Sequence, residues 1–253
     1  MKYHVRRNFF SPMCGDWQDN STASHALFHR MCNFNCKFCC NNYHDANTYV
    51  NYTEEQFVLL ICNLLKDGSR FKFSGGEPTL DPQLSTALNI IHDLGGFVFL
   101  DTNGSVPTVI ERLIDKKLID VIGISLKGVS RREAMDVSQT TNGNLCWDNV
   151  LKSIELASFA KLRTIVTYVF WNNKNYDDLE RFSDIIAPYK YVYLKVNNLL
   201  HKNHHEQGLK PIEADSFDEM CYRFIESHPE WRGKMIVVNK EEAITNYEKI
   251  IFL

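Results

Sequence analysis

The sequence predicts an α/β fold, a partial (three-quarter) open parallel (β/α)6 barrel. Short apolar segments alternate six times with segments of helical periodicity between residues 26 and 198, and each apolar segment ends at a polar cluster. Right-handed crossovers join such units into a parallel sheet, and six units are fewer than the eight that close a full barrel. We therefore expect a core at 26–198, with a short N-terminal cap at 1–25 and an α-rich C-terminal extension at 199–253 in the same domain.

The expected elements follow from apolar spacing and from signals at their ends. Residues 53–66 carry apolar side chains at helical spacing, and Thr53 with Gln56 forms a capping box. Glycines at 95 and 96 end the second helix. The expected strands are residues 26–31, 70–73, 97–100, 119–126, 163–170 and 191–196. The expected helices are residues 53–66, 81–94, 106–117, 144–159 and 176–186, and the tail adds a helix around 215–227, an apolar run at 235–238 and a helix near 240–250.

A polar or glycine-rich cluster follows every predicted strand. In parallel strand–helix folds these positions lie at the carboxyl edge of the sheet, where active sites form. Their convergence at one edge indicates a functional site there. The clusters are Cys32–Cys39, Gly75–Pro78, Asp101–Gly104, Ser125–Gly128, Trp171–Asn173 and Asn197–Asn198.

The composition indicates an ordinary globular protein in a reducing compartment. The chain has 253 residues and a formal net charge of −3, so it lacks the basic field typical of nucleic-acid-binding proteins. No run of about 18 apolar residues occurs, and the charged N-terminus is not followed by the apolar run of a secretory signal. The eight cysteines are unevenly spaced, which favours free thiols over a disulfide framework. We expect a cytoplasmic protein with no nucleic-acid partner and no membrane association.

Three cysteines, Cys32, Cys36 and Cys39, form a Cys-x3-Cys-x2-Cys loop directly after the first predicted strand. Thiolates are the usual ligands of iron–sulfur clusters, which normally take four, so a loop with three leaves one iron open to another ligand. The alternatives are ordinary buried thiols and a zinc site. A structural zinc site needs four ligands, whereas Cys40 adjoins Cys39 and would strain the geometry, and no second Cys-x2-Cys pair is present.

About forty residues further on, Gly75-Gly76-Glu77-Pro78 places a carboxylate beside two glycines, where backbone can approach a ligand closely. With the cysteine spacing, this motif resembles the radical S-adenosylmethionine (SAM) enzymes. The resemblance implies that Cys32, Cys36 and Cys39 hold a [4Fe–4S] cluster whose fourth iron is chelated by the methionine end of SAM. It also implies that one electron cleaves SAM to methionine and a 5′-deoxyadenosyl radical, which takes a hydrogen atom from a substrate. The protein then supplies placement and the exclusion of water.

Within this family the sequence resembles the glycyl-radical-enzyme activating enzymes, of the pyruvate formate-lyase activating enzyme type, over residues 27–198. The matching features are the cysteine loop, Asn41, the Gly-Gly-Glu motif, Asp101–Gly104 and Leu126-Lys127. The resemblance implies that Phe38 lies on the SAM adenine and that Gly75, Gly76 and Glu77 hold the SAM amino group. It also implies that Thr102, Asn103 and Lys127 contact the methionine carboxylate or the ribose. By the same resemblance, Asn198 lies near the adenine or the ribose.

Two departures separate the chain from the activating enzymes. Those enzymes carry a glycine-rich, arginine-containing stretch before the first cysteine, whereas residues 23–30 here read Ala-Ser-His-Ala-Leu-Phe-His-Arg. Ser125, counted among the expected SAM-site residues, stands where they have an aspartate that helps to hold a monovalent cation, which weakens the expectation of a cation site. These departures favour a smaller substrate, such as a peptide or a natural-product intermediate.

We therefore expect a radical SAM enzyme that attacks a C–H bond of a small molecule or a peptide. Two alternatives stay open: an activating enzyme that installs a glycyl radical on a partner enzyme, and a non-catalytic protein with a structural iron–sulfur or zinc site. The reductive chemistry implies an electron donor such as flavodoxin or ferredoxin, and we expect a monomer. Cys14 and Cys40 are candidate hydrogen-atom donors, because a thiol near a substrate radical can return a hydrogen atom.

Overall fold

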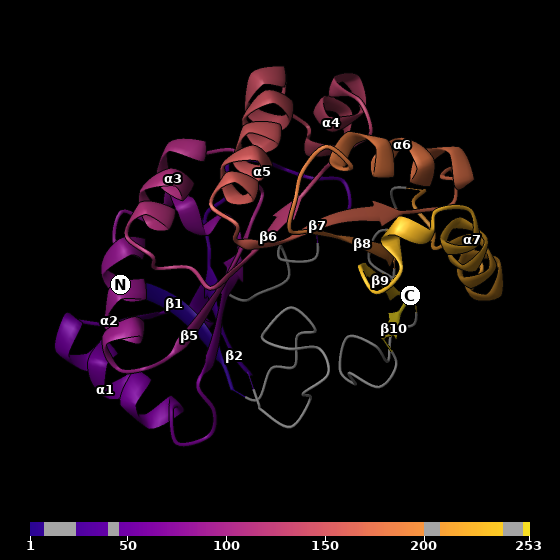
Figure 1. Ribbon diagram of the computed structural model, residues 1–253. Coiled ribbons are helices and arrows are strands. Elements are labelled where there is room, and N and C mark those ends of the chain that lie inside the picture. Colours follow the sequence, from indigo (N-terminus) through magenta and orange to yellow (C-terminus); the bar gives the residue numbers. More distant parts are fainter. Residues whose placement is uncertain (8–23, 40–45, 200–207, 240–249) are drawn as a thin grey trace.

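A single ten-stranded sheet organises the protein. The computed structural model describes residues 1–7, 24–39, 46–199, 208–239 and 250–253. The strand order is β10-β9-β8-β7-β6-β5-β4-β2-β1-β3. Figure 1 shows the sheet curving through the molecule, with helices α1 to α7 along its outer side. The α/β class with a mostly parallel sheet is confirmed.

Seven neighbouring strands are parallel, one more than predicted. The additional strand is β9, the apolar run of the tail, which pairs with β8 from Leu194↔Met235 to Asn197↔Val238. Periodicity alone does not assign so short an apolar run to a strand or a helix. The parallel strands are β2 (Ser24–His29), β4 (Arg70–Gly75), β5 (Phe97–Thr102), β6 (Val121–Ser125), β7 (Arg163–Phe170), β8 (Val192–Asn198) and β9 (Met235–Val238).

Short antiparallel strands flank the parallel part on both sides. β1 (Lys2–Arg6) pairs with β2, and β3 (Val50–Asn51) pairs with β1. β10 (Ile251–Phe252) pairs with β9 at the other end. The N-terminal segment was expected to be irregular, but its first residues form β1 because Tyr3 is fully buried against the core. The helix predicted near 240–250 lies almost wholly outside the described residues.

The helices lie close to their predicted positions, with two differences. The capping box is confirmed, since the Thr53 and Gln56 side chains each accept a hydrogen bond from the other's backbone N–H. The helix predicted at 144–159 begins with a π-helical turn at Asn144–Asp148, and α4 was not predicted. The helices are α1 (Glu54–Leu64), α2 (Leu84–Asp93), α3 (Pro107–Asp115), α4 (Arg131–Ser138), α5 (Asn149–Phe159), α6 (Tyr176–Ile186) and α7 (Ala214–Ser227).

The two faces of the sheet differ in character because side chains alternate along each strand. The helix-covered face forms the main core, in which Phe73, Leu100 and Ile124 are fully buried. The inner face has a separate apolar floor of Phe99, Val121, Ile165, Ile236, Val238 and Ile250. Around and above this floor, toward the carboxyl ends of the strands, an inner polar layer consists of Lys72, Ser74, Asp101, Ser125, Thr167, Lys195 and Asn197.

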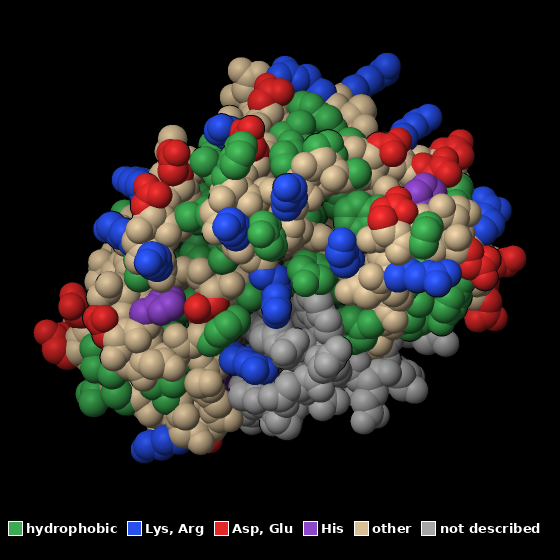
Figure 2. Space-filling view, in the orientation of Figure 1, with side chains coloured by type: hydrophobic (Ala, Val, Ile, Leu, Met, Phe, Trp, Pro, Cys, Tyr) green, Lys and Arg blue, Asp and Glu red, His purple; other side chains and the backbone are tan. Residues whose placement is uncertain are grey.

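Charged side chains of both signs are interspersed over the face of the molecule that Figure 2 shows. Among the residues that the structure describes, no helix combines the length and the apolar character needed to cross a membrane.

Candidate functional site

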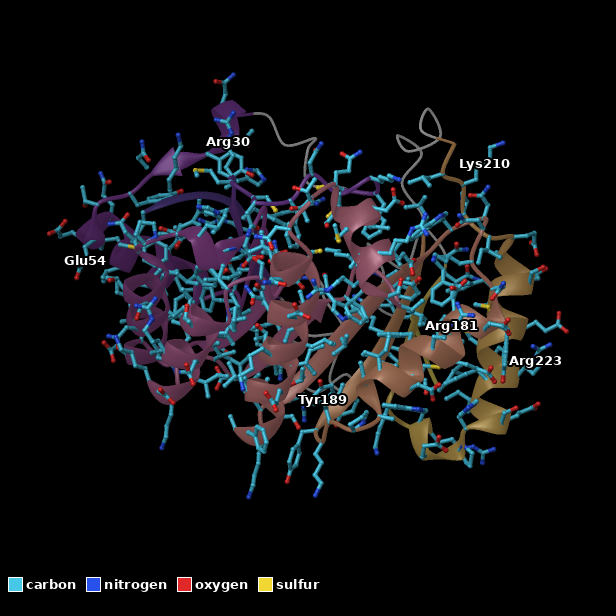
Figure 3. The ribbon with its side chains drawn as sticks, turned by 90° about the horizontal axis from the view of Figure 1, so that it is seen from above. Arg30, Glu54, Arg181, Tyr189, Lys210 and Arg223 are labelled. Atoms are coloured by element: carbon cyan, nitrogen blue, oxygen red, sulfur yellow. The ribbon has the colours of Figure 1, made fainter. Side chains whose placement is uncertain are left out.

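The carboxyl ends of the parallel strands gather the sequence motifs at one edge of the sheet. Figure 3 shows Arg30, which follows β2, and Lys210, whose backbone bonds Asn172 after β7, on one side of the molecule. Tyr189, which precedes β8, lies on the opposite side. The cysteine loop (residues 32–39) follows β2 at this edge, and the Gly-Gly-Glu turn (residues 75–77) ends β4.

The Gly-Gly-Glu turn is joined directly to the chain that enters the cysteine loop. The N–H groups of Gly76 and Glu77 donate to the carbonyls of His29 and Met31, both at 2.6 Å. A Cβ at Gly75, which has a φ of +107°, would lie 2.3 Å from the His29 oxygen, and one at Gly76 would lie 2.1 Å from the Met31 oxygen. Glycine is therefore required at both positions by the close approach of two backbones.

The carboxylate of Glu77 is fully buried and ties the end of β4 to the end of β5. Its Oε1 accepts from the Thr79 N–H (3.0 Å), the Thr79 hydroxyl (2.5 Å) and the Thr102 hydroxyl (2.6 Å), and its Oε2 accepts from the Asn103 N–H (2.6 Å). Burial raises the pKa of Glu77, and these donors oppose that rise. Because both oxygens are engaged, the side chain acts as a brace, and the exposed face of the turn is backbone.

The loop after β5 also reaches the cysteine loop. The Asn103 side-chain amide donates to the Asn33 carboxamide oxygen at 2.9 Å and to the Cys32 sulfur at 3.8 Å. Asn33 in turn donates to the Ser105 hydroxyl at 2.8 Å. Asn103 was predicted as a site residue, whereas Asn33 and Ser105 were not. Asn33 occupies an unspecified position of the Cys-x3-Cys spacing and Ser105 lies one residue beyond the predicted turn.

The last turn of α4 supports the other side of the cysteine loop. The backbone N–H of Asn35 donates to the Ser138 carbonyl at 3.1 Å, and that of Lys37 donates to the Val137 carbonyl at 3.0 Å. The Lys37 ammonium pairs with Asp136 at 2.6 Å. The loop thus fills part of the bonding capacity that the end of a helix leaves open.

Phe38 lies between the cysteine loop and the loop that follows β7. Its ring packs 5.7 Å from that of Trp171, and the Lys127 ammonium stands 5.5 Å above it. Burial raises the pKa of Cys32 and Cys36, whereas the nearby Lys127 ammonium lowers it. A cation beside these sulfurs favours their thiolate form, which is the form that binds metal.

A family model described as the Radical SAM superfamily matches residues 27–186. The match covers more than half of the chain and includes the cysteine loop, the Gly-Gly-Glu turn and strands β4 to β7. The chain belongs to the radical SAM superfamily. Members of this family use a [4Fe–4S] cluster and SAM.

The radical SAM relatives carry different named activities. An S-adenosylmethionine-dependent nucleotide dehydratase of Flammeovirga pacifica is 23% identical over 225 residues, which are 85% of this chain and 74% of that protein. A Methanocaldococcus jannaschii protein named as a glycyl-radical enzyme activating enzyme is 30% identical over 164 residues, 63% of this chain and 68% of that protein. A Saccharolobus islandicus protein named as a GTP 3′,8-cyclase is 26% identical over 193 residues, 75% of this chain and 59% of that protein.

Solved structures share the fold at low identity. Streptococcus suis SuiB bound to S-adenosylmethionine superimposes with a TM-score of 0.66 at 16% identity, covering 83% of this chain and 48% of SuiB. A radical SAM methyltransferase from Sphaerobacter thermophilus gives a TM-score of 0.64 at 12% identity, covering 88% of this chain and 68% of that chain. The chain therefore spans about half the length of SuiB, and these likenesses establish the fold.

The cysteine loop fits the donor set of the family's cluster. Cys32, Cys36 and Cys39 are free thiols of one short loop, and Cys32 is exposed while the other two are partly exposed. Within the described ranges, no three His, Cys, Asp or Glu side chains converge to hold one metal ion. A [4Fe–4S] cluster takes one thiolate per iron, so its ligands stand apart around the cluster.

Asn198 joins the end of β8 to the C-terminal segment. Its side-chain amide donates to the Ile212 carbonyl (2.8 Å) and to the Asn239 carboxamide oxygen (2.9 Å), and its own oxygen accepts from the Ile212 N–H (2.9 Å). The side chain is buried and engaged on both sides. Its predicted contact with SAM remains a prediction beside this structural role.

Of the other predicted residues, one lies within the described structure and two lie outside it. Ser125 ends β6 on the inner face, opposite Thr167 in the register, and is partly exposed. Cys14 and Cys40, the candidate hydrogen-atom donors, lie outside the described residues.

Charged groups are concentrated in the inner polar layer below the motifs. The Lys72 ammonium lies 3.0 Å from Asp101, which also accepts from the Ser74 hydroxyl at 3.0 Å. Burial would raise the pKa of Asp101, but the ammonium groups of Lys72 and Lys195 together hold it below the usual range. The Asp101 carboxylate lies over Gly123, where a Cβ would stand 3.0 Å from its oxygen.

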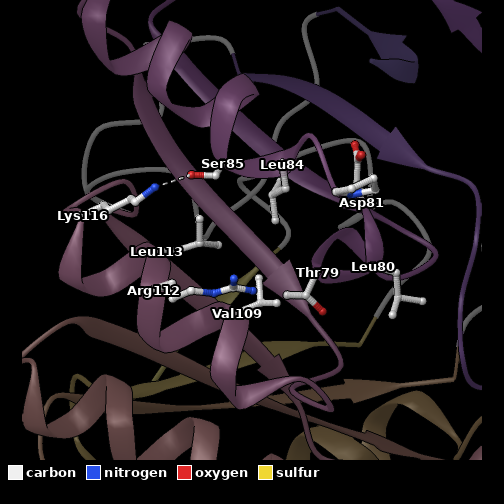
Figure 4. A pocket seen from close by; sticks show the side chains of 10 residues that line it. Thr79, Leu80, Asp81, Leu84, Ser85, Val109, Arg112, Leu113 and Lys116 are labelled. Atoms are coloured by element: carbon white, nitrogen blue, oxygen red, sulfur yellow. Dashed lines mark hydrogen bonds between the residues drawn. The ribbon is translucent and has the colours of Figure 1, made fainter.

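A separate hollow lies between α2 and α3 (Figure 4). Arg112 of α3 and Lys116, which follows the helix as its C-cap, line one wall, and the Lys116 ammonium donates to the Ser85 hydroxyl of α2 at 3.5 Å. It shares only Thr79 with the bracing of the Gly-Gly-Glu turn, and no residue of the cysteine loop lines it. The hollow is therefore distinct from the radical SAM motifs.

Proposed function

We propose that the chain cleaves SAM reductively and that the resulting 5′-deoxyadenosyl radical takes a hydrogen atom from a small polar molecule. The observation that carries this proposal is the joining of the Gly-Gly-Glu turn to the chain that enters the cysteine loop by two 2.6 Å backbone hydrogen bonds, above the inner polar layer. When bound, the cluster and SAM supply the electron and the radical, with methionine as the second product. A flavodoxin or a ferredoxin is the proposed electron donor.

In this proposal the residues of the edge have separate roles. Cys32, Cys36 and Cys39 hold the cluster, and the backbone of the Gly-Gly-Glu turn receives the SAM amino group. Phe38 lies against the adenine, and Lys127 neutralises the methionine carboxylate. Thr102 and Asn103 give hydrogen bonds to Glu77, so they act by fixing the turn. Ser125 and Asn198 complete the proposed SAM site.

The inner polar layer is the proposed substrate site, and nucleotides are the first class to test. The Lys72–Asp101 pair is positioned beneath the motifs, and the buried Asn197 carboxamide oxygen accepts no hydrogen bond within the described structure. Such a layer suits a substrate with several polar groups. Two of the relatives are named as a nucleotide dehydratase and a GTP cyclase.

Anaerobically reconstituted protein, reduced with dithionite and given SAM, tests the proposal. We expect four irons per chain and 5′-deoxyadenosine in the wild type, with no 5′-deoxyadenosine from Cys36→Ala. Deuterated nucleoside triphosphates then identify the substrate, because deuterium from the attacked carbon appears in 5′-deoxyadenosine. Zinc in place of iron, or iron without SAM cleavage, would contradict the proposal and favour the non-catalytic alternative.

A second candidate is an activating enzyme, favoured by the relative at 30% identity that carries this name. A peptide substrate belongs with it, since one matched structure is SuiB bound to its precursor peptide. In this case nucleotides would leave 5′-deoxyadenosine without deuterium. A glycyl-radical enzyme incubated with the reduced protein and SAM would instead gain a protein radical detectable by electron paramagnetic resonance.

A further inference from the structure

Helix α4 is anchored at its first turn by a carboxylate that lies against the sheet. Glu133 accepts from the Val129 N–H at 2.9 Å and from the Tyr168 hydroxyl at 2.8 Å, and it forms an ion pair with Lys174. Only 17% of the Glu133 side chain and 8% of the Lys174 side chain are exposed. Gly128 lets the chain pass close to α4, since a Cβ there would lie 2.6 Å from the Ala134 nitrogen. The helix is thus held at one end by a buried ion pair and carries the cysteine loop at the other.

Lys174 also reaches the cysteine loop by a second route. Its ammonium stands 4.7 Å from the centre of the Trp171 ring, and that ring packs against Phe38 of the loop. Asp178 of α6 lies 3.8 Å from the same ammonium. The buried Lys174 ammonium therefore contacts α4 through Glu133. It also contacts Trp171, which packs on Phe38 of the cysteine loop.

Stability alone gives little reason for an ion pair in this place. Removing two charges from water costs much of what their attraction returns, and apolar residues of similar volume often replace such a pair without loss of stability. A charged pair with several fixed hydrogen bonds does constrain direction, which an apolar contact does not. The partners span β7, the loop before α4 and the loop after β7, so the direction that the pair fixes is that of α4 relative to the sheet.

We propose that the Glu133–Lys174 pair is a positioning device that sets the place of the cysteine loop through α4 and through Trp171. The residues act through others and touch neither the loop sulfurs nor the inner polar layer in the contacts described above. The proposal deepens the proposed function, because the loop it positions is the one that would hold the cluster and Phe38. Its structural part, the restraint of the loop by the pair, is independent of SAM cleavage.

Hydrogen exchange of the metal-free protein tests that structural part directly. The Asn35 and Lys37 amides, which donate to α4, report whether the helix stays seated on the loop. We expect Lys174→Met, and the double variant Glu133→Gln with Lys174→Met, to raise exchange at both amides about tenfold while the amides of β5 stay unchanged. The double variant is decisive where Lys174→Met alone fails to fold, because it removes the charge of Glu133 together with that of Lys174, while Asp178 keeps the hydrogen bond from the Asn175 N–H.

Asp120→Asn is the matched control. Asp120 is also a partly buried carboxylate that accepts a backbone hydrogen bond, from the Val98 N–H at 2.7 Å, but it lies directly before β6, at the opposite end of the strand from the loop. We expect this variant to leave exchange at Asn35 and Lys37 unchanged. A folded double variant with wild-type exchange at these two amides would overturn the proposal.

Reconstituted protein gives a second readout that separates positioning from loss of fold. We expect the folded double variant to bind the cluster and to show a shifted reduction potential and a KM for SAM about tenfold higher, because supports of metal ligands typically have effects of this size. An unchanged potential together with an unchanged KM would overturn the link to the cluster. If the wild type failed to cleave SAM, the proposed function would fail while the exchange experiment still decided the structural part.

Discussion

The cysteine loop has two supports, and they are built from different chemistry. On the motif side, the Gly-Gly-Glu turn and the loop after β5 hold it through backbone hydrogen bonds and through uncharged donors around the Glu77 carboxylate. On the helix side, α4 holds it through two helix-terminal carbonyls, and α4 itself depends on the Glu133–Lys174 ion pair. The motif side joins residues of short sequence motifs that lie 25 to 71 positions apart, whereas the ion pair joins residues 41 positions apart that belong to no such motif.

The motif side can therefore be recognised from short sequence motifs, whereas the helix side depends on how distant segments fold together. The motif side places backbone atoms, so it depends on the absence of side chains at Gly75 and Gly76 and tolerates little change. The helix side instead places a whole helix through side chains from distant segments. We expect changes on the motif side to have the larger effects.

Gly76→Ala should break the motif side and give the largest effect. Its Cβ would lie 2.1 Å from the backbone oxygen of Met31, which cannot move without displacing the entrance to the cysteine loop. We expect a loss of about 3 kcal/mol in the free energy of unfolding, at the upper end for overpacking, and iron content reduced by more than half. Urea unfolding and iron analysis measure these effects. In the control Gly95→Ala, the new Cβ would have no atom within 4 Å, so only the strain of its φ of +81° remains.

Much of the motif side was predictable from the sequence, because its determinants lie in short spacings. The meeting of the cysteine loop, Gly75 to Glu77 and the Asp101–Gly104 cluster at one edge was predicted from their places after successive strands, and the roles of Thr102 and Asn103 were predicted from the family resemblance. The orientation of the Glu77 side chain was not predictable. From the sequence, a carboxylate in this motif is expected to bind the SAM amino group. The fold shows instead that Thr79, Thr102 and Asn103 donate hydrogen bonds to it.

The helix side was not predicted, for reasons that are also physical. Ser130 and Glu133 carry the signal of a helix start, but α4 is only eight residues long, so its periodicity is weak. The pairing of Glu133 with Lys174 depends on how two loops fold over the sheet. Likewise, β9 and β10 form by pairing with strands that are distant in sequence, and a short apolar run does not indicate which strand it will pair with.

Glu77→Gln tests whether the motif side needs a carboxylate or only a side chain of that shape. The amide nitrogen of Gln cannot accept, so at least one of the four donors around it would lose its partner. We expect a loss of about 2–3 kcal/mol in the free energy of unfolding, the range for hydrogen bonds to a charged group. Thr102→Val, which removes one donor to Glu77 and the acceptor of the Gly104 N–H, should cost about 1–2 kcal/mol in the same urea experiment. Equal costs for the two variants would show that the carboxylate is not the centre of the brace.

Asp101→Asn sharpens the comparison, because Asp101 lies directly before the motif side but is surrounded by cations. Lys72 and Lys195 hold its pKa below the usual range, so its contribution to stability is present above its ordinary pKa of 3.8 and is lost as pH falls through the lower folded value. We expect the wild type to lose more stability than the variant between pH 6 and pH 3. Urea unfolding across this range measures it, with the exposed Asp148→Asn as a control. Parallel pH curves for wild type and Asp101→Asn would contradict the assignment.

Ser130→Ala weakens the helix side alone and should give the smallest effect. The Ser130 hydroxyl accepts from the Glu133 N–H at 3.2 Å and begins α4, so its loss should cost about 1 kcal/mol. Asn175→Ala removes the cap of α6, which does not touch the cysteine loop, at a similar expected cost. Both variants should therefore unfold at similar urea concentrations, while only Ser130→Ala raises hydrogen exchange at Asn35 and Lys37. If both caps raised exchange at these amides equally, general loosening of the fold would explain the effect, and the helix side would not be a separate support.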